Sequence, residues 1–567
     1  MHVLRRAAVD PGNQTGDRLT RPQAGTETRH AGGEPAQAGN AEPASAGVGR
    51  LRPWRLARNG PRAGRPEQLA IGAALVLGLA VRIWILRHPL GALDSDEAVI
   101  GLMADRLRSS HQMTTFFWGQ NYGAPIEAII AAGLFSVVRA SVVALKVVPI
   151  ALSAVAALLT WRIGRLLASP AAGRWAGTLL WAWPPAFVYW STKTAVYWGS
   201  LCLSLAAVLL ASRLARQDGG ARAAGARLAE FAGLGLAVGL SWWANPQTLY
   251  LLAPAAVWFA VPLIRRWAYL PAAAAGAAVG AAPWLRYGLI HHWASLATIQ
   301  RQPAGTPAYA GRLLGFFKTA LPEALSLRQP YTGRWELGRA GPVLYVTVLA
   351  GFALWLALAL LRSLRPGATR GPLLVALVAL TYPFLFAASP MSWYVAFPRY
   401  LLFLAPAVAL LLGLAAARSW VWLPLLALAG VLTVTGIASL NASGQAQPYG
   451  PDVHVPVDLA PLQSLLTRYH VRDAFADYWL AYRTTFQTGE TTLVDPTYVV
   501  RDPLIDGQVR ASPDPAYLFI TASATLTAFE RDAQQLGVPL ALHAEGPFTL
   551  ALPQRKVLPG QLAGLTP

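Results

Sequence analysis

The feature that most constrains this chain is a series of long apolar runs separated by short segments rich in arginine. Apolar residues make up 54% of the 567 residues and charged residues only 13%, about half of what an ordinary soluble domain carries. A run of roughly 20 apolar residues is long enough to cross a bilayer as an α-helix. The sequence therefore predicts an all-α protein that passes through a membrane many times.

The apolar runs define about eleven predicted membrane spans. They cover residues 69–86, 141–164, 175–190, 196–212, 228–244, 248–264, 269–287, 342–361, 372–388, 400–417 and 420–440. A shorter run at residues 123–138 contains Glu127 and decides the topology. If this run crosses the membrane, the arginine clusters of the later turns fall outside. If it lies in the interface, they fall in the cytoplasm, where such clusters are usually found, so we expect it to be interfacial.

These spans divide the chain into three expected parts. Residues 1–68 are rich in Gly, Pro, Ala and Arg, which indicates a disordered basic tail, and the arginines before the first span place this tail in the cytoplasm. Residues 69–440 form the membrane domain, with external, non-cytoplasmic loops at residues 87–140, where interfacial helices are expected, and 288–341. Residues 441–567 then form an external soluble α/β domain, with helices expected at 459–469 and 526–536 and strands at 474–482, 517–521 and 547–552. The expected location is the plasma membrane.

The net charge of +20 does not indicate a nucleic-acid partner. The arginines are scattered in short clusters between apolar runs, and the sequence has no RNA-binding signature and no zinc-finger spacing. Topology explains much of this charge, and the partner that we expect is the lipid bilayer. The single cysteine, Cys202, lies inside an apolar run and excludes an intrachain disulfide.

An acidic cluster follows the first span, where Asp94, Asp96 and Glu97 fall within four positions. From Asp96 onward the apolar residues share one helical face and the polar residues the other, which predicts a short helix on the membrane surface with the acids at its start. Charge beside a segment of hydrocarbon length is costly and tends to be functional. The alternative is that Asp96 and Glu97 only complement the positive end of the helix dipole.

The motif Asp96-Glu97 on such a helix resembles the Asp-Glu motif of the GT-C membrane glycosyltransferases. The chain is similar to the group that contains the dolichyl-phosphate-mannose–protein mannosyltransferases and the aminoarabinose lipid A transferases, a glycosyltransferase family 39-like pattern. Further motifs follow in the family's order, at Trp118-Gly119-Gln120-Asn121-Tyr122-Gly123-Ala124-Pro125, Leu145-Lys146, Arg165-Leu166-Leu167, Pro184-Pro185 and Arg399-Tyr400-Leu401-Leu402. The likeness covers residues 69–440, and the C-terminal part is much less diagnostic.

This resemblance implies that a sugar, hexose or pentose, is transferred from a polyprenyl-phosphate carrier to an acceptor hydroxyl at the external face, with inversion. A hydroxyl has a high pKa and needs a carboxylate base, which must stand opposite the departing phosphate. We expect Asp96 to be this base and Glu97 to position the sugar or acceptor. Asp94, Trp118 and Tyr122 are expected to bind substrate. The acceptor, a protein, lipid or glycan, is left open.

The departing phosphate needs cations where its charge develops. The expected residues are Lys193, in a short external turn lined by aromatic side chains, and Arg399 with Tyr400 at the entry of a late span. The alternative is that these residues are interfacial anchors or part of an aromatic belt, which is what we expect of Arg139 and Lys146.

No cofactor is expected. The carboxylates of Asp94 and Asp96 are oxygen ligands that suit a divalent metal, but the resemblance implies metal-independent transfer, so a metal is not favoured. The chain departs from the group in the turn at residues 191–195, which holds no acid where members of the group often carry one. Either Asp94 or Glu97 then takes the role of that acid, or the mechanism differs in detail.

The rival interpretation is a transporter or flippase of lipid-linked sugars. Such a protein is expected to have broken helices and charges in the middle of the membrane. The interiors of the predicted spans are nearly free of Asp and Glu, and the polar groups gather at the external face. This distribution favours chemistry on a lipid-linked substrate at the membrane surface.

Overall fold

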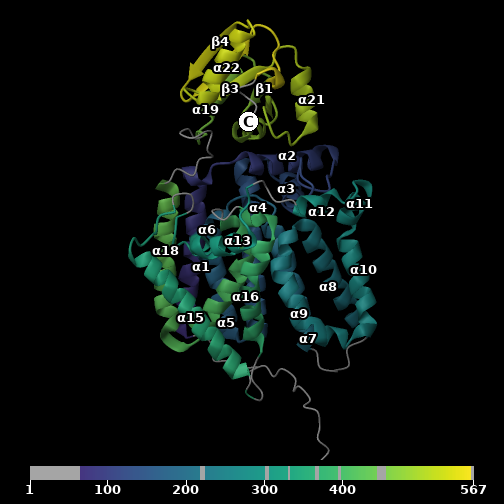
Figure 1. Cartoon of the computed structure of the whole chain (residues 1–567), viewed down its shortest axis with the longest axis vertical. Helices are drawn as coiled ribbons and strands as arrows, with labels where there is room; N and C mark the ends of the chain where they lie inside the picture. The colour runs from purple at the N-terminus through teal and green to yellow at the C-terminus, as the bar shows by residue number, and fades with distance from the viewer. Residues whose placement is uncertain are drawn as a thin grey trace, which may run out of the picture. The chain divides into compact units, whose positions relative to one another are not determined.

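The structure is a computed structural model that describes residues 64–216, 224–300, 305–329, 333–363, 365, 370–393, 398–442 and 455–562. Most of the predicted N-terminal tail, residues 1–63, lies outside these ranges. In Figure 1 the membrane-length helices run from purple through teal to green, and the strands of the C-terminal residues are yellow.

Each predicted span contains a helix. The helices of the bundle are α1 (Arg65–Leu86), α4 (Val142–Leu167), α5 (Pro170–Ala182), α6 (Pro185–Trp190), α7 (Trp198–Arg216), α8 (Ala224–Ala244), α9 (Leu249–Ile264), α10 (Leu270–Gly280), α11 (Ala282–Ile290), α15 (Ala340–Ser363), α16 (Gly371–Ala388), α17 (Ala405–Ala416) and α18 (Trp422–Ala442). Short 3-10 turns flank several of them, at η1 (Pro89–Gly91), η2 (Pro246–Thr248), η3 (Trp267–Tyr269), η5 (Pro390–Trp393), η6 (Pro398–Leu404) and η7 (Ser419–Val421).

Fewer helices than predicted meet both the length and the apolar composition that a membrane span needs. Within the described residues, 8 helices are long and apolar enough to cross a membrane, and the bent pair that contains α10 and α11 makes a ninth. The other two predicted spans are filled by α8, whose apolar content is lowered by Arg227 and Glu230, and by the short helices α5 and α6, which are separated at Trp183 and Pro184. The predicted count of eleven is therefore not confirmed, although the all-α membrane fold is.

The helices pack through one large apolar core and through close backbone contacts. The core joins α4, α5, α7, α9, α16 and α17. Helices α8 and α10 approach so closely that a Cβ atom on Gly235 would lie 1.8 Å from the carbonyl oxygen of Ala273. Small residues at such contacts are typical of helix packing in membranes. There the hydrophobic effect does not drive helices together, and van der Waals contact between closely spaced backbones replaces it.

Two shorter helices, α2 (Ser95–Ser110) and α3 (Ile126–Phe135), lie between α1 and α4 in the sequence. At one end of α3, Glu127 accepts a hydrogen bond from the backbone N–H of Gly199 at the start of α7. At its other end, the ring of Phe135 lies 6.5 Å from that of Phe486 in the C-terminal domain. Both contacts are at the end of the bundle where α2 lies, so α3 does not cross the bundle.

The predicted loop at residues 288–341 is partly helical. It contains α12 (Ala294–Gln300), α13 (Tyr309–Gly315), the π-helical turn η4 (Phe316–Ala320) and α14 (Leu321–Ala324).

The C-terminal domain is a five-stranded sheet with helices, as the α/β expectation requires. Its strands are β1 (Asp473–Ala476), β2 (Leu493–Pro496), β3 (Ala516–Ile520), β4 (Leu540–Glu545) and β5 (Phe548–Pro553), in the spatial order β2-β1-β3-β5-β4. Strands β2, β1 and β3 are parallel, and β5 and β4 continue the sheet antiparallel. Its helices are α19 (Ala460–Arg468), α20 (Tyr478–Gln487), α21 (Pro503–Ala511) and α22 (Ala524–Gln535), followed by the turn η8 (Pro559–Gln561).

One element of this domain differs from the prediction. The strand expected at residues 474–482 ends at Ala476, and helix α20 begins at Tyr478. The side chain of Asp477 accepts the backbone N–H of Trp479 and caps the helix, which explains the change. The sequence also did not predict β2, β4 or α21.

The domain packs directly on α2 through α20. A Cβ atom on Gly101 would lie 2.5 Å from the ring of Phe486, so the absent side chain allows the two helices to touch. Arg106 of α2 forms an ion pair of 2.9 Å with Asp502. One apolar core joins α2, α3 and the start of α4 to the sheet and helices of the domain.

Candidate active site

The acidic cluster folds as the N-terminus of α2. Asp94 is the capping residue: its Oδ1 accepts the backbone N–H of Glu97 at 2.9 Å, and Glu97 Oε2 accepts the backbone N–H of Asp94 at 3.3 Å. An acid followed three positions later by Glu is a local signal for this reciprocal cap. The alternative that the acids serve only the start of the helix does not describe Glu97, because Glu97 and the capping residue Asp94 also make contacts far from α2.

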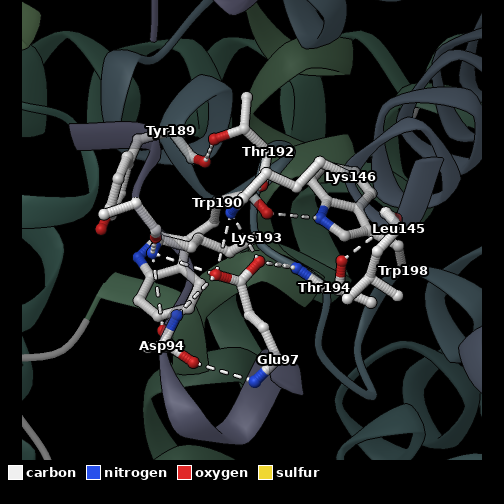
Figure 2. A network of polar contacts seen from close by, with 11 residues as sticks. Asp94, Glu97, Leu145, Lys146, Tyr189, Trp190, Thr192, Lys193, Thr194 and Trp198 are labelled. Atoms are coloured by element: carbon white, nitrogen blue, oxygen red, sulfur yellow. Dashed lines mark hydrogen bonds and ion pairs between the residues drawn. The ribbon is translucent and has the colours of Figure 1, made fainter. Parts of the chain in front are cut away.

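Glu97 lies at the centre of a buried ion network (Figure 2). Lys146 Nζ donates to its two carboxylate oxygens at 2.8 and 2.9 Å, and Lys193 Nζ donates to Oε2 at 3.2 Å. The backbone N–H of Thr194 donates to Oε1 at 2.8 Å. Because the Glu97 side chain is only 2% exposed, these donors replace water almost completely.

The network is electrically balanced. Lys193 Nζ also contacts Asp94 Oδ2 at 3.5 Å and donates to the carbonyl oxygen of Ala92 at 2.8 Å. Burial opposes the charge of each group, but Glu97 raises the pKa of Lys193 above its ordinary value, and Lys193 lowers that of Asp94. Two carboxylates thus face two ammonium groups, and the network joins α2, α4 and the turn between α6 and α7.

A buried arginine of α1 fixes that turn. The side chain of Arg82 is 1% exposed; its Nε donates to Ser191 Oγ at 2.8 Å, and its Nη1 donates to the carbonyl oxygens of Gly78 and Trp181 at 2.8 and 2.9 Å. The guanidinium also lies 3.8 Å from the centre of the Trp181 ring. These contacts position the segment that carries Lys193, and the sequence analysis did not identify Arg82.

Asp96 points away from this network. It is half-buried, and its Oδ1 accepts the hydroxyl of Tyr478 from the C-terminal domain at 2.5 Å. Burial, together with the nearby charge of Asp94, raises the pKa of Asp96, while the charges of Arg399 and Arg501 and the hydrogen bond from Tyr478 oppose this rise. A carboxylate with a raised pKa in a partly closed site has the character of a proton acceptor.

Arg501 stands behind Tyr478. Its Nε donates to the Tyr478 hydroxyl at 3.3 Å, and its guanidinium lies 5.4 Å from the ring centre of Phe117 and 5.5 Å from that of Tyr478. The backbone N–H groups of Arg501 and Asp502 both donate to the hydroxyl of Tyr482, which fixes the loop. No local pattern in the sequence marks Tyr478 or Arg501 as functional residues.

The predicted cation Arg399 reaches the same region from η6. Its guanidinium lies 5.3 Å from the ring centre of Trp190 and donates through Nη2 to the Tyr400 hydroxyl at 3.2 Å. The ring of Tyr400 in turn packs edge-on against Tyr197 at 6.1 Å. Arg399 is thus in contact with Tyr400, and its charge lies within electrostatic range of Asp96, where it opposes the rise in pKa.

Trp118 and Tyr122, the two aromatic residues expected to bind substrate, lie in different places. Trp118 packs under Arg106, 5.3 Å from its guanidinium, while its neighbours Phe117 and Gly119 lie against Arg501. Its predicted contact with substrate stays a prediction. Tyr122 lies within electrostatic range of Arg501 and is near the site.

The two predicted anchors also differ. Arg139 is exposed, as an anchor would be. Lys146 is 1% exposed and is the main cation on Glu97, so the expectation that it is an anchor is wrong. The reason is the fold: Lys146 follows the start of α4 by one turn, where α2 lies against that helix.

The carboxylates of Asp94 and Glu97 converge on Lys193, but that of Asp96 does not share this partner. Asp94 faces Lys193 and Asp96 faces Tyr478. Within the part of the chain that the structure describes, no group of three or more His, Cys, Asp or Glu side chains could hold a metal ion.

No protein-family model and no curated protein matches this chain. Among solved structures, ArnT from Cupriavidus metallidurans bound to undecaprenyl phosphate matches with a TM-score of 0.55 at 12% identity, over 88% of this chain and 98% of that one. The same protein in its apo state matches with a TM-score of 0.54 at 10% identity, over 86% and 97%. The chain therefore shares the fold of ArnT, which confirms the GT-C fold that the resemblance implied.

Proposed function

We propose that this protein is a membrane glycosyltransferase that moves a sugar from a polyprenyl-phosphate carrier to an acceptor hydroxyl. The observation that carries the proposal is the position of Asp96. Asp94 and Glu97 are ion-paired with lysines, whereas Asp96 is half-buried, hydrogen-bonded to a tyrosine and within electrostatic range of Arg399 and Arg501. A carboxylate held next to cations at one end of a membrane bundle suits a base that acts beside a phosphate.

The fold supports the proposed donor. ArnT, whose fold this chain shares, is described in complex with undecaprenyl phosphate. A polyprenyl tail lies in the bilayer, so the carrier presents its phosphate and the attached sugar at the membrane surface. Asp96 and Arg399 lie at an end of the bundle, where α2 and η6 begin.

The proposed reaction is a single displacement. The oxygen of the acceptor hydroxyl attacks the anomeric carbon of the sugar and forms the new glycosidic bond, while the bond from that carbon to the phosphate oxygen breaks. Asp96 takes the proton of the hydroxyl, and the electron pair of the broken bond leaves with the polyprenyl phosphate. One displacement inverts the anomeric centre, which requires the base and the phosphate on opposite faces of the sugar.

The charged side chains divide these tasks. Arg399 stabilises the negative charge that develops on the leaving phosphate. Glu97, Lys146 and Lys193 neutralise one another with Asp94, so they hold α2 in place rather than supply net charge. This changes the predicted role of Glu97 from a group that touches substrate to one that positions Asp96.

The membrane orientation belongs to the same proposal. The arginine-rich turns place the N-terminal tail in the cytoplasm, and Asp96 and the C-terminal domain then lie on the external face of the plasma membrane. A transporter or flippase of lipid-linked sugars is less favoured, because the ion network centred on Glu97 lies at one end of the bundle, at the start of the helix that also carries Asp96.

The test compares Asp96→Asn with wild type and with Asp105→Asn. Asp105 is on the same helix and pairs with Arg108 near the surface, so it controls for loss of an acid from α2. Each protein is purified and supplied with a panel of polyprenyl-phosphate sugars and hydroxyl acceptors, and release of free polyprenyl phosphate is measured. We expect turnover in wild type and Asp105→Asn, and loss of at least about 10²-fold in Asp96→Asn.

Two outcomes would contradict the proposal. Equal turnover in wild type and Asp96→Asn would remove Asp96 as the base. Absence of release from every donor and acceptor in the panel, with folded protein that does not bind polyprenyl phosphate, would remove the donor class.

A further inference from the structure

The C-terminal domain presents one particular edge to α2. Tyr478 follows β1 directly, and Arg501 lies in the loop that follows β2. These strands are parallel neighbours, so both loops leave the sheet at its carboxyl edge. In open α/β sheets this edge is where ligands and functional groups usually lie. Here it faces Asp96.

The contact between this edge and the membrane domain is built from several elements. Tyr478 donates its hydroxyl hydrogen to Asp96, and Arg501 donates to the Tyr478 oxygen. The guanidinium of Arg501 is held against Phe117, which belongs to the loop after α2. The ion pair between Arg106 and Asp502 fixes the same loop of the domain to α2. These contacts together hold Tyr478 in a fixed position at Asp96.

We propose that the C-terminal domain completes the active site, with Tyr478, supported by Arg501, as the residue that positions the carboxylate of Asp96 and keeps it ready to accept a proton. This inference rests on the proposed function, which gives Asp96 its task as a base. Tyr478 is a positioning residue, since it acts on substrate through Asp96. The sugar-transfer step itself is unchanged.

The direction of the effect follows from the groups that face Asp96. Asp94, on the same turn of α2, and burial favour the protonated form, while Arg399 from η6 and the two groups of the domain, Tyr478 and Arg501, favour the carboxylate. A base must be ionised to act. Removing the Tyr478 hydroxyl removes a hydrogen bond to the ionised form, so the pKa of Asp96 should rise and activity should be lost at a higher pH on the acid side.

The experiment uses the full-length protein with Tyr478→Phe, and Tyr498→Phe as the matched control. Tyr498 lies in the same domain and also donates its hydroxyl to a carboxylate, Asp477 Oδ2, at 2.7 Å. We expect the acid limb of kcat/KM to move upward by about one pH unit in Tyr478→Phe, from the usual strength of a hydrogen bond to a charged group. At a pH well below both limbs, kcat/KM divided by its plateau value is then about tenfold lower in Tyr478→Phe than in wild type.

A second readout does not need turnover. A water-soluble carbodiimide reacts with protonated carboxyl groups, and mass spectrometry of the peptide that contains Asp96 gives labelling against pH. The labelling midpoint should shift upward in Tyr478→Phe by the same amount as the acid limb, and Tyr498→Phe should match wild type. Arg501→Gln should shift it in the same direction by less, because Arg501 acts partly through Tyr478.

The outcomes separate this inference from the proposed function. An unchanged labelling midpoint in Tyr478→Phe would overturn the inference, whatever the turnover. A loss of activity by one factor at every pH, or an equal shift in Tyr498→Phe, would also overturn it, since either result indicates a general structural role. A shifted midpoint in a protein that releases no polyprenyl phosphate would support the coupling of the domain to Asp96. The same result would contradict only the proposed transferase function.

Discussion

Replacing Glu97 with glutamine tests whether the buried network holds the site together. Glu97 accepts from Lys146, Lys193 and the backbone of Thr194, and the two lysine side chains are 1% and 5% exposed. Without its charge, two buried ammonium groups share the single carboxylate of Asp94. Breaking a buried ion pair by removing one partner typically costs about 3–5 kcal/mol, and we expect a loss of stability in this range.

The assay is unfolding in mixed micelles with an increasing fraction of SDS, followed by tryptophan fluorescence. Glu67→Gln is the control, because Glu67 makes one ion pair of 3.0 Å with Arg174 and both side chains are partly exposed. That variant should lose no more than about 1 kcal/mol. A loss below about 1 kcal/mol in Glu97→Gln would refute the reasoning, since the lysines would then not depend on this carboxylate.

A double variant sharpens the same test. Lys146→Met removes one of the two cations and keeps a side chain of similar length, so Glu97→Gln with Lys146→Met leaves Asp94 facing Lys193. Residues in one ion network are not additive, and the double variant should be more stable than the sum of the two single losses predicts. Simple additivity of the single losses would indicate that the two residues act independently.

The remaining predictions concern charge at other positions. Arg399→Gln should lower kcat by about 10²-fold in the release assay, whereas Arg165→Gln, on an exposed position of α4, should not; equal loss in both would remove the phosphate role. Burial raises the pKa of Glu127 to about 7, above the ordinary value for Glu, so this group stabilises the fold below the unfolded pKa and the benefit is lost as pH rises through 7. Thermal unfolding should therefore show that wild type loses about 2–3 kcal/mol between pH 5 and 8 more than Glu127→Gln does, and parallel pH profiles would contradict the assignment.

The parts of the fold that the sequence predicted are those that depend on local pattern. Apolar runs of membrane length gave the positions of the bundle helices, because the bilayer sets that length directly. The separation of apolar and polar residues onto two faces from Asp96 onward predicted α2, because this pattern lies within a single helix. Alternation of apolar residues alone was less reliable, and it extended β1 into residues that the Asp477 cap turns into α20.

The parts that the sequence could not predict depend on contacts between distant segments. Lys146 has the position of an ordinary interfacial lysine, and only the packing of α2 on α4 turns it into the partner of Glu97. Arg82 looks like a cation near the end of a span, but its partners come from α5 and the turn after α6. Tyr478 and Arg501 lie in a domain whose sequence carries no motif, so their approach to Asp96 required the folded chain.

The hydrogen bond between Asp96 and Tyr478 joins residues that are 382 positions apart. During synthesis, the ribosome completes α2 long before it reaches the domain that supplies the tyrosine. A polypeptide that stops early, or whose last domain fails to fold, contains the acid without its partner. The order of the two residues in the gene product thus delays assembly of this contact until the chain is nearly complete.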